Sequence, residues 1–274
     1  MSLKRDVEIA AAAAAVGAAV VRQRFGSTLE QVDKGGGDFA TSADVEAEQA
    51  ILALLRRECP DDAILGEETG RSGREASARM WLIDPLCGTR NYAAGMRLVA
   101  VNVALEAGGH FTIAAVADPF ADEVFWTDGS AAWKRASGHD APLAPDAGSG
   151  LVELNLDPPF PNAPGFRATA LAAQPGFALR FRPRVVSTSL ALVWVAAGRR
   201  AAYVTDGDMR RNVHFAAGLA LCAAAGCTLT DLRGQPWGRG PTGLVAAADA
   251  QTHALLLDLI RQAGASPAAS FRSS

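Results

Sequence analysis

Residues 81–92 constrain the fold of this chain more than any other stretch, because an apolar run leads directly into a tight polar turn. The segment reads Trp-Leu-Ile-Asp-Pro-Leu-Cys-Gly-Thr-Arg-Asn-Tyr. The apolar run ends at Asp84, and the Pro and Gly-Thr that follow predict a turn. Such a turn brings a carboxylate, a thiol, a hydroxyl and several free backbone N–H groups into one small volume. This combination suits a hard cation held next to a phosphate group.

A second acidic position lies shortly upstream of this turn. Glu67 and Glu68 follow a separate short apolar run in the sequence Leu-Gly-Glu-Glu-Thr-Gly. Two strand ends that carry carboxylates can converge on one metal ion. Because a buried strand end seldom keeps a carboxylate without a partner, Glu67 and Asp84 are the strongest candidates. We expect Glu68 to be a solvated neighbour of Glu67.

Composition excludes several classes of function. A chain of 274 residues allows one large domain or two smaller ones. The net charge of −3, without basic runs that interleave with aromatic residues, argues against a nucleic-acid partner. Four cysteines without a Cys-x-x-Cys pair predict free thiols and a reducing cytoplasm. The alanine-rich run at 9–21 is too short to span a bilayer, so we expect a soluble helix packed through its small residues and no membrane partner.

The turns and apolar runs predict an α+β / α/β chain in two parts. Residues 1–140 should form an α+β domain with an antiparallel sheet and the metal and phosphate motifs, and residues 141–274 an α/β domain that completes the site. The expected helices lie at 4–25, 42–59, 164–174, 188–198, 213–225 and 250–263, the second capped by Ser42. The expected strands lie at 63–66, 79–84, 98–107, 111–117, 122–127, 131–135, 151–155, 179–186, 201–205, 227–231 and 243–247.

Four blocks in this order resemble the inositol monophosphatase family of magnesium-dependent phosphatases. They are Gly-Asp-Phe-Ala-Thr-Ser-Ala-Asp at 37–44, Gly-Glu-Glu at 66–68, the segment 81–92, and Val-His-Phe-Ala-Ala-Gly at 213–218. The middle block is the specific one, since the family motif there is Asp-Pro-Ile/Leu-Asp-Gly-Thr. The resemblance covers nearly the whole chain. It implies a layered αβαβα sandwich of the inositol monophosphatase / fructose-1,6-bisphosphatase type, with the site between the two halves.

The resemblance also implies a role for each matching residue. Glu67 and Asp84 match ligands of a first metal ion, Mg²⁺, and Leu86 matches a residue that binds it through the backbone carbonyl. Gly88 and Thr89 match the phosphate-binding turn. Thr89 also matches the hydroxyl that orients the attacking water together with Glu67. Asp44 matches a residue that supports the site through hydrogen bonds.

Two substitutions depart from the family pattern. Cys87 stands where the family has its second Asp, and Val213-His214 stands where the family has Trp-Asp. Both lost carboxylates belong, by resemblance, to a second metal site that shares Asp84. A thiolate and an imidazole suit a softer ion such as Zn²⁺ or Mn²⁺ better than Mg²⁺. Three alternatives follow: the second site binds a softer ion, it is empty, or catalysis has been lost.

Asp206 and Asp208 lie in an Asp-Gly-Asp segment that offers a substitute carboxylate. The other interpretation, which we favour slightly, is a polar surface turn, since Asp and Gly are common in turns for local reasons.

The predicted function is therefore that of a metal-dependent phosphomonoesterase. It would hydrolyse a small polyol or sugar-like phosphate by in-line attack of metal-activated water. Arg90-Asn91-Tyr92 resembles the Thr-Asn-Phe variant of the motif and favours monophosphates. Histidinol-phosphate and nucleotide phosphatases share the scaffold and stay open, as does a catalytically impaired relative that binds a phosphorylated ligand or a protein partner. A homodimer is expected only from the resemblance.

Overall fold

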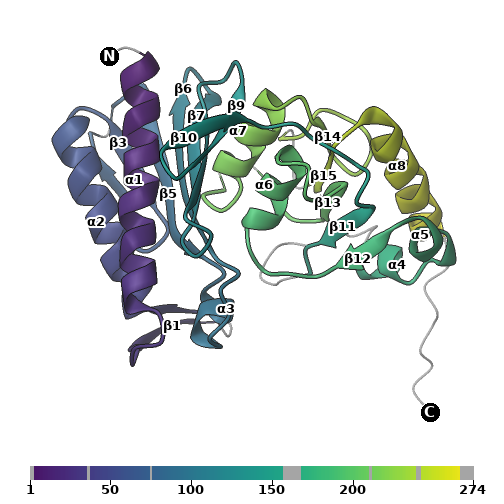
Figure 1. Cartoon of the computed structure of the whole chain (residues 1–274), viewed down its shortest axis with the longest axis horizontal. Helices are drawn as coiled ribbons and strands as arrows, with labels where there is room; N and C mark the ends of the chain where they lie inside the picture. The colour runs from purple at the N-terminus through teal and green to yellow at the C-terminus, as the bar shows by residue number, and fades with distance from the viewer. Residues whose placement is uncertain are drawn as a thin grey trace.

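The computed structural model describes residues 3–35, 38–74, 76–156, 168–209, 212–238 and 242–265. The chain forms five layers, in which helices and sheets alternate from one end of the molecule to the other (Figure 1). Helices α1 (Leu3–Arg24) and α2 (Ser42–Glu58) form the first layer, and the first sheet lies against them. The predicted αβαβα sandwich is confirmed.

The first sheet has eight strands in the order β10-β9-β8-β7-β6-β5-β3-β4. Its neighbours pair antiparallel, except β3 and β5, which run parallel. The edge strands β4 and β10 were not predicted, and neither was the small β1–β2 hairpin. The strands of the sheet are β3 (Ala63–Gly66), β4 (Gly70–Gly73), β5 (Arg79–Cys87), β6 (Ala100–Ala107), β7 (His110–Asp118), β8 (Glu123–Thr127), β9 (Ala132–Ala136) and β10 (His139–Pro142), and the hairpin comprises β1 (Gln31–Gly35) and β2 (Asp38–Thr41).

The second sheet has five strands in the order β12-β11-β13-β15-β14. Strand β11 pairs parallel with β12 and β13, whereas β15 pairs antiparallel with β13 and β14. The predicted strand at 179–186 is wrong over its first half, because Pro175 starts a short helix, α5 (Pro175–Arg180), that leaves only three residues for the strand. The strands are β11 (Leu151–Leu154), β12 (Arg182–Arg184), β13 (Ala202–Thr205), β14 (Thr228–Thr230) and β15 (Leu244–Ala247).

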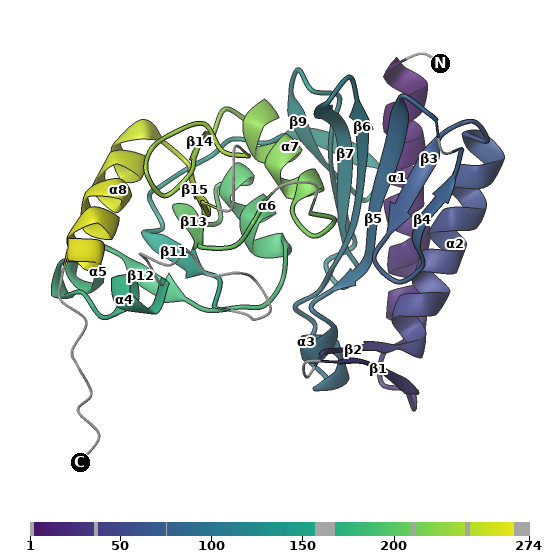
Figure 2. The same ribbon diagram turned by 180° about the vertical axis from the view of Figure 1, so that it is seen from behind.

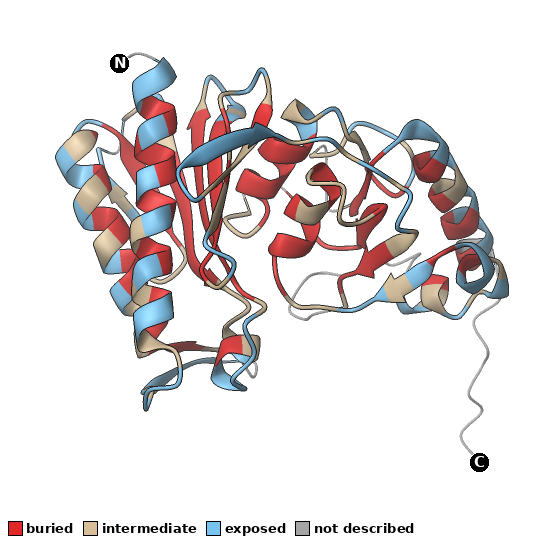
Figure 3. Ribbon diagram, in the orientation of Figure 1, coloured by how far each residue is buried: buried red, intermediate tan, exposed pale blue. Residues whose placement is uncertain are grey.

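The middle layer consists of α6 (Leu190–Ala196) and α7 (Ala216–Ala224), which lie between the two sheets (Figure 2). Almost every residue of these two helices is buried, as Figure 3 shows. One hydrophobic cluster joins Leu82 and Ala104 of the first sheet to Val193 and Ala217 of the helices. A second cluster joins the same helices to the second sheet. The boundary near residue 140 stays a prediction, and these clusters cross it.

The outer layer covers the far face of the second sheet. It contains α8 (Ala250–Ala265), α4 (Ala168–Ala172) and α5, which share a cluster with β11, β13 and β15. A short helix, α3 (Thr89–Ala93), follows β5 and lies below the first sheet in Figure 1.

Helix α1 packs closely through its small residues, as the alanine-rich sequence predicts. A Cβ atom at Gly17 would lie only 2.7 Å from Cδ1 of Ile51 on α2 and 2.9 Å from Cγ1 of Val101 on β6. Ala14 is fully buried beside Gly17, whereas Ala15 faces outward. Within the described residues, no helix is long and apolar enough to cross a membrane.

This close packing predicts that Ala14→Leu will destabilise the fold. The larger side chain has no space between the helices and the sheet, and overpacking of this kind costs about 1–3 kcal/mol. Urea denaturation followed by circular dichroism measures the change in the free energy of unfolding. Ala15→Leu is the matched control and should shift that free energy by no more than about 0.5 kcal/mol. Equal effects of the two substitutions would contradict the packing described here.

Candidate functional site

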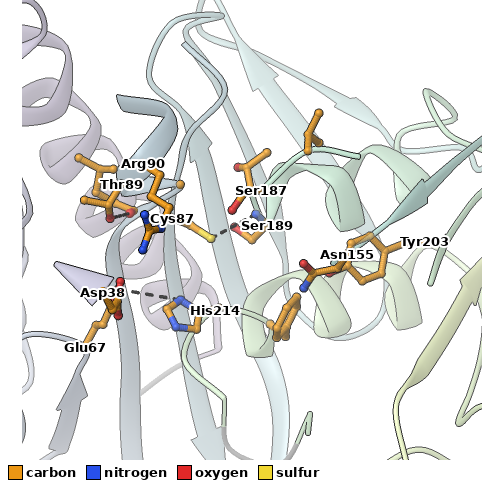
Figure 4. A pocket seen from close by; sticks show the side chains of 15 residues that line it. Asp38, Glu67, Cys87, Thr89, Arg90, Asn155, Ser187, Ser189, Tyr203 and His214 are labelled. Atoms are coloured by element: carbon orange, nitrogen blue, oxygen red, sulfur yellow. Dashed lines mark hydrogen bonds and ion pairs between the residues drawn. The ribbon is translucent and has the colours of Figure 1, made fainter. Parts of the chain in front are cut away.

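A cavity of about 430 Å³ opens between the two sheets. Glu67, Cys87, Thr89 and Arg90 come from the first half of the chain, and Asn155, Tyr203 and His214 face them from the second half (Figure 4). The loop 186–189, which precedes α6, completes the wall between these groups. The two halves therefore contribute to one cavity.

Parallel pairing of β3 with β5 brings the two predicted carboxylates to one edge of the first sheet. Gly66 stands opposite Ile83 in this pairing, and the N–H of Glu67 donates to the carbonyl of Ile83 at 3.1 Å. Glu67 therefore leaves its strand beside Asp84, the next residue along β5. The sequence indicated two converging acidic strand ends, and the sheet register brings them together.

Asp84 is fully buried and accepts three polar contacts. Its Oδ1 accepts from the backbone N–H of Leu86 at 3.1 Å. Its Oδ2 accepts from Nδ2 of Asn102 at 3.2 Å and lies 2.7 Å from Nδ1 of His214. These bonds hold a buried charge in one orientation, which a carboxylate away from water requires.

Asp84, Cys87 and His214 form a group that could hold a metal ion, since their ligand atoms all lie within 4.8 Å of one another. Cys87 and His214, the two positions that depart from the family motif, therefore lie next to each other and to Asp84. The Cys87 sulfur accepts the backbone N–H of Ser189 at 3.2 Å, and the Ser189 hydroxyl bonds to Asn102. Ser189 from the second half and Asn102 from the first half therefore contact the candidate ligands Cys87 and Asp84.

The protonation of this group depends on its burial and its charges. Burial raises the pKa of the Cys87 thiol to about 11, and the Asp84 carboxylate adds to this shift. Burial opposes the charged form of His214, but the charge and hydrogen bond of Asp84, together with Cys87 and Glu67, raise the pKa of His214. Burial likewise opposes ionisation of Asp84, but the charge and hydrogen bond of His214, together with hydrogen bonds from Glu67 and Cys87, lower the pKa of Asp84. An ion binding here would displace protons from the thiol and the imidazole.

The two side-chain oxygens of Glu67 have different surroundings. Oε1 accepts from Nζ of Lys34 at 3.1 Å. Oε2 is buried without a hydrogen-bond partner in the described structure, and it lies 3.9 Å from Nδ1 of His214. Burial, with repulsion from Asp84 as a second cause, raises the pKa of Glu67. A buried carboxylate oxygen that accepts no hydrogen bond, and whose ion pair with His214 is long, has room for a cation as a closer partner.

The prediction that Glu68 is a solvated neighbour is wrong. Its side chain is only 8% exposed, and its Oε1 accepts from Nζ of Lys34 at 2.7 Å. The β1–β2 hairpin carries Lys34 to this place, so the hairpin supplies a cation to both glutamates.

Asp44 holds the Gly88-Thr89 turn in place through a hydrogen bond. The Thr89 hydroxyl lies 2.8 Å from Oδ1 of Asp44 and 3.1 Å from the carbonyl oxygen of Leu86. The second oxygen of Asp44 accepts the backbone N–H of Thr41 at 2.8 Å and also the Thr41 hydroxyl. Thr41, not the predicted Ser42, is thus the N-cap of α2.

Gly88 is the position in this turn that excludes a side chain. Its φ of 103° is a conformation that L-residues rarely adopt. A Cβ atom there would lie 2.8 Å from the carbonyl oxygen of Ser187 and 2.9 Å from that of Leu98. Nδ2 of Asn91 donates to the same two carbonyls at 2.9 Å each, so the turn lies tightly against the loop of the second half.

Asp206 and Asp208 are not part of the three-residue group among the residues that the structure describes. Asp206 is 2% exposed, so the interpretation of a polar surface turn is wrong for this residue. Gly37 of the first sequence block lies outside the described residues.

Sequence reasoning missed three residues that support the site. Asn102 and Ser189 contact Asp84 and Cys87, and Glu48 accepts a backbone N–H of the turn that follows β3. Asn102 interrupts an apolar strand and Glu48 interrupts the apolar face of a predicted helix, so each buried polar residue was a signal in itself. Ser189 gave no such signal, because serine at a helix start is common for local reasons.

Comparison with known proteins agrees with this geometry. The model of the inositol monophosphatase family matches residues 3–265. An inositol-1-monophosphatase of Caulobacter vibrioides is 33% identical over 221 residues, covering 76% of this chain and 82% of that protein. A fructose-1,6-bisphosphatase/inositol-1-monophosphatase of Aquifex aeolicus is 35% identical over 127 residues, and that match covers 46% of this chain and 48% of the relative.

A solved structure supports the fold over nearly the full length. The extragenic suppressor protein suhB of Bartonella henselae superposes with a TM-score of 0.79 at 24% identity, covering 93% of this chain and 98% of that one. The family match, the five layers and the acidic strand ends beside a Gly-Thr turn agree with one another. This chain belongs to the inositol monophosphatase family, a family of metal-dependent phosphatases.

Proposed function

We propose that this chain hydrolyses a small polyol or sugar-like phosphomonoester with the help of divalent cations. One observation carries the proposal: Glu67, Leu86 and the Gly88-Thr89 turn line a single cavity. The buried Asp84 contacts the backbone N–H of Leu86 and the ring of His214, and both of these residues line the same cavity. Hard oxygen donors next to a turn with free backbone N–H groups match the needs of a cation and a phosphate.

Glu67, Asp84 and the backbone carbonyl of Leu86 would hold a first ion, Mg²⁺. All three donors are oxygen atoms, as Mg²⁺ prefers, and Oε2 of Glu67, which accepts no hydrogen bond, would gain a close partner. A bound cation of this kind neutralises phosphoryl charge and lowers the pKa of a coordinated water.

The remaining groups of the turn would position the reactants. Thr89 and Glu67 would orient a water molecule in line with the phosphorus atom. Asp44 would keep the Thr89 hydroxyl in place through the bond that it already makes. Gly88 would allow the turn to lie against the carbonyls of Ser187 and Leu98, since a Cβ atom there would lie too close to both.

Asp84, Cys87 and His214 would hold a second, softer ion on the side of the leaving alcohol. One oxygen, one sulfur and one nitrogen donor form a mixed set that favours Zn²⁺, Co²⁺ or Mn²⁺ over Mg²⁺. The N–H of Ser189 that points at the sulfur supports this assignment, because it would stabilise a thiolate. We also propose that the protein is cytoplasmic and, from the family resemblance alone, that it forms a homodimer.

The substrate would lie with its alcohol portion against the second half of the chain. Asn155, Tyr203 and the loop 186–189 line that end of the cavity. A volume of about 430 Å³ suits a single small metabolite. Histidinol phosphate and nucleotides are further candidates on the same scaffold.

A second candidate function rests on the substitutions at Cys87 and His214. Loss of two carboxylates from one ion site fits a relative that binds a phosphorylated ligand or a protein partner without turnover. The two candidates differ in whether any phosphomonoester is hydrolysed with any divalent ion.

The first prediction is that Glu67→Gln and Asp84→Asn abolish phosphatase activity. Loss of groups behind metal ligands already costs about 10–100-fold in activity, so loss of a ligand should cost at least about 100-fold. Release of inorganic phosphate from a panel of phosphomonoesters, with Mg²⁺, Mn²⁺, Zn²⁺ and Co²⁺ in turn, measures this. No hydrolysis by the wild-type chain under any of these conditions, while a phosphorylated ligand still binds, would favour the second candidate.

The second prediction is that Co²⁺ bound to the wild-type chain shows a thiolate-to-metal charge-transfer absorption that Cys87→Ser removes. The sulfur lies among the proposed ligands, so only its loss should remove this absorption. Cys227→Ser is the matched control, because this thiol does not line the cavity. An absorption that persists in Cys87→Ser would refute the assignment.

The third prediction concerns the double change Cys87→Asp and His214→Asp. Replacing soft donors by carboxylates should lower turnover with Zn²⁺ or Co²⁺ and raise turnover with Mg²⁺. Initial rates at saturating substrate measure both. A gain with Mg²⁺ without any loss with the softer ions would indicate a merely degraded magnesium site.

A further inference from the structure

We infer that Glu48 is a positioning residue that fixes Glu67, and that α2 sets the distance between Glu67 and Thr89. The inference rests on the proposed function, since it assigns to Glu67 a role in holding an ion. Glu48 lies on α2, outside the cavity, and its side chain is fully buried.

Both oxygens of Glu48 accept backbone N–H groups from the turn that follows β3. Oε2 accepts from the N–H of Glu68 at 2.9 Å, and Oε1 accepts from that of Thr69 at 2.8 Å. The N–H of Glu67 itself donates to Ile83. The backbone of three successive residues is thus held by named acceptors, so the Glu67 side chain starts from a fixed point.

Gly66 brings the turn against this carboxylate. A Cβ atom at Gly66 would lie only 2.5 Å from Oε1 of Glu48. The carboxylate therefore fills the space that a side chain at 66 would need. The two residues adjoining Glu67 on either side are in direct contact with Glu48 or bonded to it.

A carboxylate suits this position better than any amide. Its two oxygens accept from two N–H groups at once, and charged acceptors make the stronger hydrogen bonds. The amide of glutamine has one acceptor oxygen, and its NH₂ group would face a second donor. Glu48→Gln would therefore leave one backbone N–H of the turn without an acceptor while preserving the side-chain volume.

Helix α2 carries Asp44 one turn before Glu48, and residues four apart lie on the same face of a helix. Asp44 bonds to the Thr89 hydroxyl, and Glu48 bonds to the turn of Glu67. Two buried carboxylates of one rigid element thus hold the two groups that would orient the attacking water. The spacing between those groups is set by the pitch of α2.

The experiment compares Glu48→Gln with Glu46→Gln in metal binding and in catalysis. Mn²⁺ binding, followed through the electron paramagnetic resonance signal of the free ion, needs no turnover. We expect Glu48→Gln to weaken Mn²⁺ binding and to lower kcat by about 10–100-fold, with little change in KM. Glu46→Gln, on the same helix with a side chain 45% exposed, should leave both unchanged.

A double-mutant cycle tests whether Glu48 acts through Glu67. In a Glu67→Gln background, Glu48→Gln should cause no further loss of Mn²⁺ affinity. A full additional loss would overturn the inference, as would a single variant that binds Mn²⁺ like the wild type. If the wild-type chain binds no Mn²⁺, the proposed function fails and the inference with it.

A second variant covers the case in which Glu48→Gln does not fold. Gly66→Ala keeps glutamate at position 48, but the added methyl group would displace the Glu48 carboxylate from the turn. This variant should therefore weaken Mn²⁺ binding in the same way. Normal Mn²⁺ binding by a folded Gly66→Ala chain would contradict the inference.

Discussion

Two carboxylates meet at one edge of the first sheet, and much of the site depends on the free-energy cost of burying their charges. The parallel pairing of β3 and β5 brings Glu67 and Asp84 together. Carboxylates that share a buried site repel each other and lose hydration, so they need cations or hydrogen-bond donors. Lys34, His214 and Asn102 meet part of that need. Oε2 of Glu67 accepts no hydrogen bond, and a divalent cation bound beside it would meet the rest.

Most of the elements were predicted from the sequence because their signals are local, whereas the five-layer arrangement was predicted from the family resemblance. The alanine-rich start, the Gly-Gly turn between β6 and β7, and the Asp-Pro-Leu-Cys-Gly-Thr segment each carry their own pattern. The predicted strand at 179–186 was partly wrong because Pro175 starts a helix, α5, that extends into the predicted strand. The edge strands β4 and β10 have little apolar alternation, so only their pairing with neighbours defines them.

The candidate site was predictable where residues match a motif and unpredictable where contacts are long-range. Glu67, Asp84, Thr89 and Asp44 follow from the motif blocks. The bond from Ser189 to the Cys87 sulfur joins residues far apart in the chain, and no local pattern announces it. The direct contact of His214 with Asp84 likewise depends on how α7 enters the space between the sheets.

The middle layer has a consequence for how the chain unfolds. Helices α6 and α7 bury apolar side chains against both sheets. If either sheet moved away from these helices, apolar side chains of the helices and of that sheet would become exposed to water. Partial opening between the halves would also break the hydrogen bond of Asn91 to Ser187 and that of Ser189 to Cys87. Cooperativity should therefore extend across the molecule, and probes in either half should report one shared denaturation transition instead of two.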